Sequence, residues 1–225
     1  MATFDWNLLG QINWFEIALA TLDTLHMLGV SLLFTVLLGL PLGVLLYISA
    51  PGQLRARPRL YAVLSVLVNV LRSLPFVILL IVLIPFTLLL VGTSIGVAGA
   101  IVPLVAGAVP FYARLVENVL REVDRGVIEA SQSMGARLPQ IITKVLLPEA
   151  LPGLIGAATV TAVALVGYTA MSGVIGGGGL GDLAVRYGYQ RFQTDVMVVT
   201  VLLLLVLVQL LQAAGDRMVQ RLRRG

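Results

Sequence analysis

One group of polar residues interrupts an apolar stretch of the chain and could line a polar path or gate. Asn69 and Arg72 are three residues apart, so they share a face on a helix, and Ser73 lies beside that face. Pro75 removes a backbone hydrogen bond and can bend the helix. A charge within a membrane costs roughly 2.5–3.5 kcal/mol on insertion scales, so it usually faces a bundle interior or an aqueous cavity. The cluster predicts a translocation path or gate; a clamp in which Arg72 caps carbonyls of a neighbouring helix is the alternative.

A second candidate for a gate lies in segment 168–173, where small residues surround one long, flexible side chain. Tyr168, Met171 and Ser172 belong to this segment. Methionine adapts its shape readily to its surroundings. We therefore predict that these residues form an external gate, where Met171 from two copies of the chain meets on an axis. Ordinary packing between helices is an equal alternative.

Other residue types argue against catalysis by this chain. A phosphate-binding loop needs Gly-Lys followed by Ser or Thr, and the single lysine, Lys144, follows Thr143 instead. The glycine-rich run 176–181 contains no lysine, and we interpret it as a permissive external loop, either a plain connector or a contact for a partner. One histidine and no cysteine predict neither a metal site nor a disulfide. The chain is expected to be a non-catalytic protein that binds no cofactor itself.

Composition places the chain in a membrane. Of its 225 residues, 59% are hydrophobic and 12% are charged, against about 25% charged in soluble domains. The net charge of +4 does not predict nucleic-acid binding, because the basic residues lie at the edges of apolar segments. The first basic residue is Arg55, so a cleaved signal peptide is not expected. Trp6, Trp14 and Phe15 predict an external interfacial segment over 1–19, with packing against the bundle as the alternative.

Five apolar segments have the length of a membrane span, about 20 residues. They are about 22–48, 60–84, 95–113, 151–173 and 195–215. Pro41 is expected to kink the first span, Arg72 and Pro75 interrupt the second, and the turn between the second and third is expected at 91–94. The prediction is an all-α integral membrane protein with a transmembrane domain over 20–215.

The distribution of Lys and Arg predicts the orientation of these spans. Segments 49–59 and 114–149 and the C-terminal tail hold twelve of them, whereas the opposite set of segments holds only Arg186 and Arg191. Basic residues favour the cytoplasmic side. The N-terminus is therefore expected outside and the tail, 216–225, in the cytoplasm. Every carboxylate lies near a span end or in a loop, which disfavours an ion- or proton-driven carrier.

The cytoplasmic segment 121–148 carries the pattern expected of a docking element. A short helix is predicted over Val127–Met134, ending at Gly135, where a left-handed residue favours glycine. Pro139 could then be the first residue of a second helix, which runs toward Leu147 until Pro148 interrupts it. Two short helices on a tight bend between spans predict a contact for a soluble partner.

The same segment resembles the EAA loop of ABC-importer permeases. Glu129-Ala130-Ser131, Gly135 and Val145-Leu146-Leu147-Pro148 match its Glu-Ala-Ala, Gly and Ile-x-Leu-Pro positions, with Ser131 and Val145 as small changes. The resemblance implies the type I ABC importer permease fold, with a cytoplasmic coupling helix that contacts an ATPase. The residues it assigns to ATPase coupling are Glu129, Ala130, Ser131, Gly135, Leu147 and Pro148. Residues 72–75 also resemble the Arg-Ser-x-Pro element of amino-acid permeases.

The resemblance is sharpest between Glu129 and Phe192, where the chain is similar to the permeases of methionine importers. It implies a homodimer in the bacterial inner membrane, two ATPase subunits that hold ATP and Mg, and a periplasmic or lipid-anchored methionine-binding protein. Two alternatives remain: an ABC permease for another small nutrient, and a membrane scaffold without a transport role. No residue here is shown by its chemistry to recognise a thioether.

Overall fold

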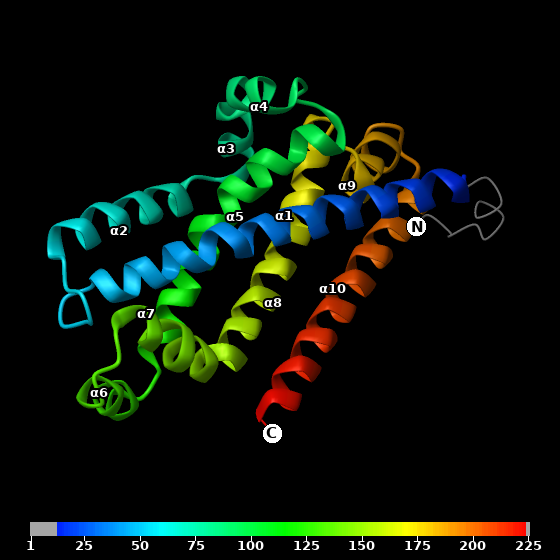
Figure 1. The fold of residues 1–225 in the computed structure, drawn as a ribbon. Coiled ribbons are helices and arrows are strands. Elements are labelled where there is room, and N and C mark those ends of the chain that lie inside the picture. Colours follow the sequence, from blue (N-terminus) through cyan, green and yellow to red (C-terminus); the bar gives the residue numbers. More distant parts are fainter. Residues whose placement is uncertain (1–12, 224–225) are drawn as a thin grey trace. The chain divides into compact units, whose positions relative to one another are not determined.

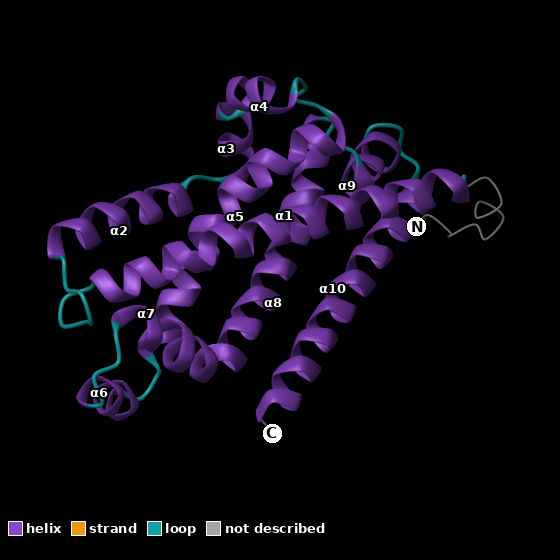
Figure 2. Cartoon of the chain, viewed as in Figure 1, coloured by secondary structure: helices purple, strands orange, loops and turns teal. Residues whose placement is uncertain are grey.

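The computed structural model describes residues 13–223, and the regular structure in this part of the chain is helical (Figures 1 and 2). The helices are α1 (Trp14–Ser49), α2 (Pro58–Ser73), α3 (Phe76–Val82), α4 (Ile84–Val91), α5 (Gly96–Arg121), α6 (Arg125–Ser133), α7 (Leu138–Ile141), α8 (Leu147–Ser172), α9 (Gly179–Leu183) and α10 (Thr194–Arg223). By length and composition, α1, α5, the run Leu138–Ile175 and α10 can each cross a membrane, and α2 with α3 gives a fifth, broken span. The predicted all-α membrane fold is confirmed.

The second predicted span, 60–84, is interrupted as expected: α2 and α3 form it, and the chain bends by 104° between them. Leu74 has φ −75° and ψ 128°, an extended conformation that ends α2. A following proline disfavours the α conformation, so Pro75 explains the break. The predicted turn at 91–94 is confirmed, because Gly92 adopts φ +79° and ends α4.

The third predicted span, 95–113, is too short. α5 continues to Arg121, so much of the segment 114–149 that the sequence assigned to a loop is helical. Arg114 and Glu117 lie beyond the predicted end of the span, and they pair with each other inside the helix. Paired charges are tolerated near the end of a membrane helix, whereas single ones are costly.

The predicted interruption at Pro148 is also wrong. α8 begins at Leu147 and runs through Pro148, and a π turn, Ile142–Leu146, precedes it. In this turn the Leu147 N–H donates to the Ile142 carbonyl, five residues back. The wider turn shifts the hydrogen-bond register where proline supplies no donor. The helical run from Leu138 therefore continues directly into the fourth span.

The ends of the described chain are helical as well. α1 begins at Trp14, so the predicted interfacial segment 1–19 overlaps this helix, and its residues 1–12, including Trp6, lie outside the described residues. Trp14 and Phe15 are exposed on the first turn of α1. α1 continues through Pro41. α10 extends to Arg223 through most of the predicted tail, and residues 224–225 are not described.

The chain divides into two compact units. Unit 1 contains the chain up to Ser31, Phe76–Leu104 and Val163–Leu210, and unit 2 contains Leu32–Pro75, Val105–Ala162 and Leu211–Gly225. The boundaries fall inside α1, α5, α8 and α10, so each long helix contributes a segment to both units. The coupling segment and the Asn69–Pro75 cluster belong to unit 2, and the predicted gate at 168–172 belongs to unit 1.

Unit 2 is held by an apolar core to which α1, α5, α6, α7 and α8 contribute. Its buried residues include Tyr47, Tyr112, Val116, Leu120, Ile128, Ile141, Leu146 and Leu154. α1 approaches α5 through Gly39 and Gly43, spaced four apart. A Cβ on Gly43 would lie 2.5 Å from the Val116 Cβ. Small residues at this spacing allow membrane helices to pack with close backbones.

Unit 1 contains the glycine-rich run, which is packed and partly helical. A Cβ on Gly181 would lie 2.4 Å from the Ala170 carbonyl oxygen, so only glycine fits there. The Leu180 N–H donates to the Thr24 hydroxyl at 2.8 Å, and Leu180 is fully buried. α9 occupies the second half of the run. The alternative of a plain flexible connector is therefore wrong.

Candidate coupling segment and translocation path

The coupling segment starts with a capped helix. The carboxylate of Asp124 accepts a hydrogen bond from the Gly126 N–H at 2.7 Å, which satisfies one of the free amides at the start of α6. The sequence predicted this helix from Val127 and missed the cap. The observed α6 therefore begins two residues earlier than expected, at Arg125.

The end of α6 is fixed by glycine, as predicted. Gly135 has φ +79°, and its N–H donates to the Gln132 carbonyl at 2.9 Å. The Ala136 N–H donates to the Ser131 carbonyl at 3.1 Å, five residues back. These two bonds form the Schellman pattern, which needs a left-handed residue at the position of Gly135.

The two faces of α6 differ sharply in exposure. Ile128 and Ser131 are buried against the core of unit 2, and the Ser131 hydroxyl donates to the Val127 carbonyl at 2.8 Å. Glu129, Ala130 and Met134 are exposed. Two of the predicted coupling residues, Glu129 and Ala130, therefore lie on the free surface, whereas Ser131 supports the helix from below.

The second half of the segment is anchored and continuous with a span. The Gln140 side chain accepts from the Arg137 N–H at 2.8 Å. α7 starts at Leu138, so Pro139 is its second residue rather than the predicted first. Leu147 packs partly buried against the core of unit 2, and Pro148 is exposed. α7 is therefore continuous with α8 through the π turn, whereas the connector around Gly135 separates α6 from this run.

A polar cavity of about 290 Å³ opens beside the exposed face of α6. The loop between α1 and α2 forms one wall and α6 forms the other. Its lining residues are Gly52, Gln53, Leu54, Arg125, Ile128, Glu129 and Gln132. The surface around Glu129 is thus concave, with both a carboxylate and a guanidinium available to a partner.

The Asn69–Pro75 cluster lies at the exposed end of α2. Asn69, Arg72, Ser73 and Pro75 are all exposed, and the Ser73 hydroxyl donates to the Asn69 carbonyl at 2.8 Å. The Arg72 guanidinium lies 5.9 Å from the centre of the Phe111 ring. Within residues 13–223, Arg72 makes no ion pair or side-chain hydrogen bond, so the predicted capping of a neighbouring carbonyl is not observed.

A different arginine contacts the neighbouring helix, and sequence reasoning missed it. Arg114 on α5 donates to the Ser65 hydroxyl at 2.8 Å and to the Asn69 side-chain oxygen at 3.0 Å. Arg114 also forms an ion pair with Glu117, whose side chain is 1% exposed. Asn69, a predicted path residue, is therefore held by α5 rather than free.

The predicted gate residues of unit 1 have three different surroundings. Tyr168 stacks on Phe76, with ring centres 4.5 Å apart and planes 7° from parallel. Ser172 is fully buried and donates to the Thr169 carbonyl at 2.7 Å. Met171 is 46% exposed and is the most exposed of the three.

Residues 39–224 match the family of binding-protein-dependent transport system inner membrane components. The chain belongs to this family. The match covers most of the protein, including the coupling segment and the Asn69–Pro75 cluster. The predicted membership among ABC-importer permeases is thereby confirmed.

Named relatives of this permease come from several bacteria. The probable D-methionine transport system permease protein MetI of Vibrio cholerae is 50% identical over 202 residues, 90% of each chain. The methionine import system permease protein MetP of Bacillus subtilis is 50% identical over 206 residues, 92% of this chain and 93% of its own. A solved structure of the inward-facing MetNI methionine ABC transporter contains a chain with 52% identity and a TM-score of 0.92, covering 93% of this chain and 97% of that one.

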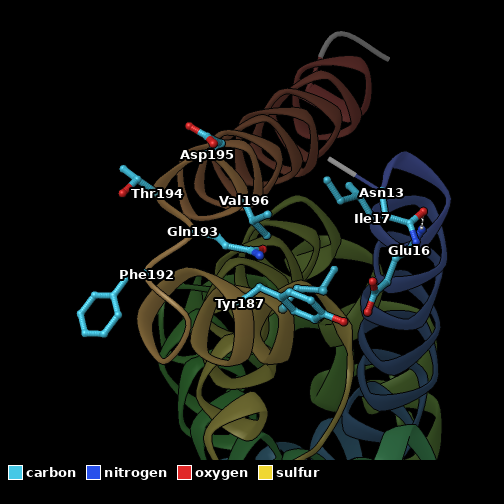
Figure 3. Close-up of a pocket in the computed structure, with 10 residues that line it drawn as sticks. Asn13, Glu16, Ile17, Tyr187, Phe192, Gln193, Thr194, Asp195 and Val196 are labelled. Carbon is cyan, nitrogen blue, oxygen red and sulfur yellow. Dashed lines mark hydrogen bonds between the residues drawn. The ribbon is translucent and has the colours of Figure 1, made fainter. Parts of the chain in front are cut away.

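The permease also has a cavity in unit 1, of about 330 Å³, that sequence reasoning missed (Figure 3). Its lining residues are Asn13, Glu16, Ile17, Leu183, Tyr187, Phe192, Gln193, Thr194, Asp195 and Val196. Figure 3 shows the side chains of Glu16 and Tyr187 directed toward the same hollow, whereas Phe192 points away. The lining comes from three separate segments of the chain, so no local motif marks it.

Proposed function

We propose that this permease is the membrane-spanning subunit of an ATP-driven importer that carries methionine, as both the L- and the D-enantiomer, into the bacterial cytoplasm. The observation that carries the transport mechanism is the capped, exposed α6, which a short connector joins to the helical run that continues from Leu138 into α8. The substrate is supported by the names of relatives that are 50% identical across 90% or more of this chain.

The partners of the proposed importer are those that the resemblance to ABC-importer permeases implies. Two copies of the permease form a homodimer in the inner membrane, and each copy receives one ATPase subunit at α6. ATP and Mg are held by those ATPase subunits, and a periplasmic or lipid-anchored methionine-binding protein delivers the solute outside. The excess of Lys and Arg in segments 49–59 and 114–149 supports an external N-terminus and a cytoplasmic tail.

The residues have separate roles in this proposal. Glu129 and Ala130 contact the ATPase, Ser131 and Leu147 seat the segment on the core, and Gly135 and Pro148 set its backbone path. Closure of the ATPase dimer displaces α6, and the helical run from Leu138 transmits the displacement to α8. The membrane pathway then changes its accessible side. Its lining is proposed to include Asn69, Arg72, Ser73, Pro75, Tyr168, Met171 and Ser172.

Uptake into membrane vesicles tests the proposal. Vesicles carrying the permease with its ATPase and binding protein are supplied with ATP and labelled amino acids in parallel. Methionine uptake that Glu129→Arg abolishes, and that Asp216→Arg leaves intact, is the expected result, because both side chains are exposed acids but only Glu129 lies on α6. Uptake of a different solute would replace methionine in the proposal.

The remaining alternative is a membrane scaffold without a transport role. Association of the permease with an ATPase distinguishes the two. A scaffold has no need of an ATPase at α6. Co-purification of an ATPase with the wild-type permease, weakened by Glu129→Arg, supports transport. A permease that purifies alone under conditions that preserve related importers would favour the scaffold.

A further inference from the structure

A polar seam joins α2 to α5 inside unit 2. We define it by Tyr61, Ser65 and Asn69 on α2 and by Arg114, Glu117 and Arg121 on α5. The three α2 residues are spaced four apart and the α5 residues three and four apart, so each set forms one stripe along its helix. Two stripes of polar side chains therefore face each other along a helix pair that is otherwise apolar.

Glu117 is the centre of the seam. Its side chain is 1% exposed, and its two carboxylate oxygens pair with different arginines: Oε2 with Arg114, and Oε1 with Arg121 at 2.6 Å. Oε1 also accepts from the Tyr61 hydroxyl at 3.1 Å. Arg114 continues the seam to the Ser65 hydroxyl and the Asn69 side-chain oxygen. Each polar group of α2 in the seam is thus bound to the ion cluster of α5.

Stability alone does not explain such a cluster. Removing charges from water is expensive, and replacing a buried ion pair by apolar residues of similar volume is often neutral or stabilising. Apolar contacts would also let α2 slide on α5, because they have no direction. Charged hydrogen bonds do have direction, so the seam fixes the register between the helices.

The opposite face of α5 leads to the coupling segment. Val116 and Leu120 are buried in the same core as Ile128 of α6 and Leu146 of the π turn. α5 therefore contacts the proposed ATPase-docking helix on one side and α2 on the other. α2 in turn carries three of the predicted path residues, Asn69, Arg72 and Ser73, at its C-terminal end.

We infer that Glu117 is a positioning residue that makes α2 move as one body with the coupling segment. Motion of α6 passes through the core to α5, and the seam passes it to α2 and its path residues. This inference rests on the proposed function for the direction of the motion. It assigns Glu117, Arg114 and Tyr61 a role that the coupling motif does not include.

Distance measurement between α2 and α5 tests the inference directly. The chain has no cysteine, so Val66→Cys and Asn118→Cys, both exposed and on these two helices, accept spin labels without competing sites. The assembled permease–ATPase complex is measured by pulsed electron resonance without nucleotide and with ATP. With the seam intact, one narrow distance distribution is expected in both states.

The key variant removes the hydrogen-bonding groups of the seam from α2 only. Tyr61→Phe with Ser65→Ala and Asn69→Ala leaves the ions of α5 paired, so folding is preserved. The distribution is expected to broaden and to differ between the nucleotide states. The matched control, Val63→Ala, shortens an exposed side chain on another face of α2 and should keep the wild-type distribution. An unchanged narrow distribution in the triple variant would overturn the inference.

A transport readout separates this inference from the proposed function. The number of ATP molecules consumed per solute imported should rise by about 5- to 150-fold in the triple variant and in Glu117→Gln. This range corresponds to typical coupling free energies between two sites. Lost coupling in a complex that still assembles with its ATPase supports a positioning role. Equal coupling in wild type and both variants overturns it. A wild type that neither binds an ATPase nor imports any solute overturns the proposed function instead, while the distance measurement on the permease still reports on the seam.

Discussion

α5 is held by two neighbours in unit 2 in opposite ways, by close backbone packing against α1 and by a polar seam against α2. Against α1, Gly39 and Gly43 remove side chains so that the helices touch. Against α2, long charged side chains span the gap and bind in fixed directions. The first contact is specified by shape and the second by charge, so different substitutions should break them.

The largest effect is expected from Glu117→Ala. The change leaves Arg114 and Arg121 without their shared carboxylate, and breaking a buried ion pair costs about 3–5 kcal/mol. Because the Arg121 side chain is 39% exposed, water solvates part of its charge once Glu117 is removed. We therefore expect a loss of stability at the lower end of this range. The midpoint of thermal unfolding of the purified permease in detergent measures it.

The matched control is Glu122→Ala, which removes an exposed carboxylate five residues along the chain. It should change the free energy of unfolding by no more than about 0.5 kcal/mol. Equal midpoints for the two variants would mean that Glu117 is not buried against its arginines in the membrane.

The next effect is expected at the glycine contact. In Gly43→Ala the new Cβ would lie 2.5 Å from the Val116 Cβ and 2.6 Å from the Ala113 carbonyl oxygen. Overpacking of this kind costs about 1–3 kcal/mol. Gly29→Ala on the same helix meets nothing within 4 Å and should gain about 0.5–1 kcal/mol from helix propensity. Opposite shifts of the unfolding midpoint are expected, and shifts of the same sign would contradict the close α1–α5 contact.

The difference between the two contacts also explains what the sequence could predict. The end of α6 follows from Gly135 alone, and the break after α2 follows from Pro75 alone, because each acts on its own backbone. The spacing of Gly39 and Gly43 is also a local signal for close helix packing, although we did not use it. Rules that depend only on neighbouring residues therefore predict the spans, the coupling helix and the residue at which that helix ends.

The polar seam could not be predicted in the same way. Arg114, Glu117 and Arg121 have the spacing of paired charges on a helix, but at the end of an apolar run they were assigned to a loop. Their partners Tyr61, Ser65 and Asn69 lie about fifty residues earlier in the chain. Only the packing of α2 on α5 brings the two stripes together. The cavity around Glu16 was missed for the same reason.

Gly135 is required for its backbone conformation and not for a close contact. A Cβ there would meet nothing within 4 Å, in contrast to Gly43, but the backbone has φ +79°. Gly135→Ala should therefore cost about 1–2 kcal/mol through left-handed strain alone. Gly135→Asn should cost less, since asparagine tolerates this conformation. The midpoints of thermal unfolding rank the two variants, and methionine uptake should fall more for Gly135→Ala than for Gly135→Asn. An equal loss in both variants would mean that Gly135 is required for its small size and not for its left-handed backbone.

The smallest effect is expected from Tyr61→Phe, which removes one hydroxyl from the seam and leaves every ion pair in place. The lost hydrogen bond to Glu117 should cost about 0.5–1.5 kcal/mol, or somewhat more because its acceptor is charged. Tyr189→Phe, at a side chain that is 71% exposed, is the control and should shift the unfolding midpoint negligibly. If the two variants shift it equally, α2 draws no stability from the ion cluster, and only the α5 half of the seam is formed. If Tyr61→Phe alone shifts it, the contact between α2 and α5 is specified by charge along its length, as the contact with α1 is specified by shape.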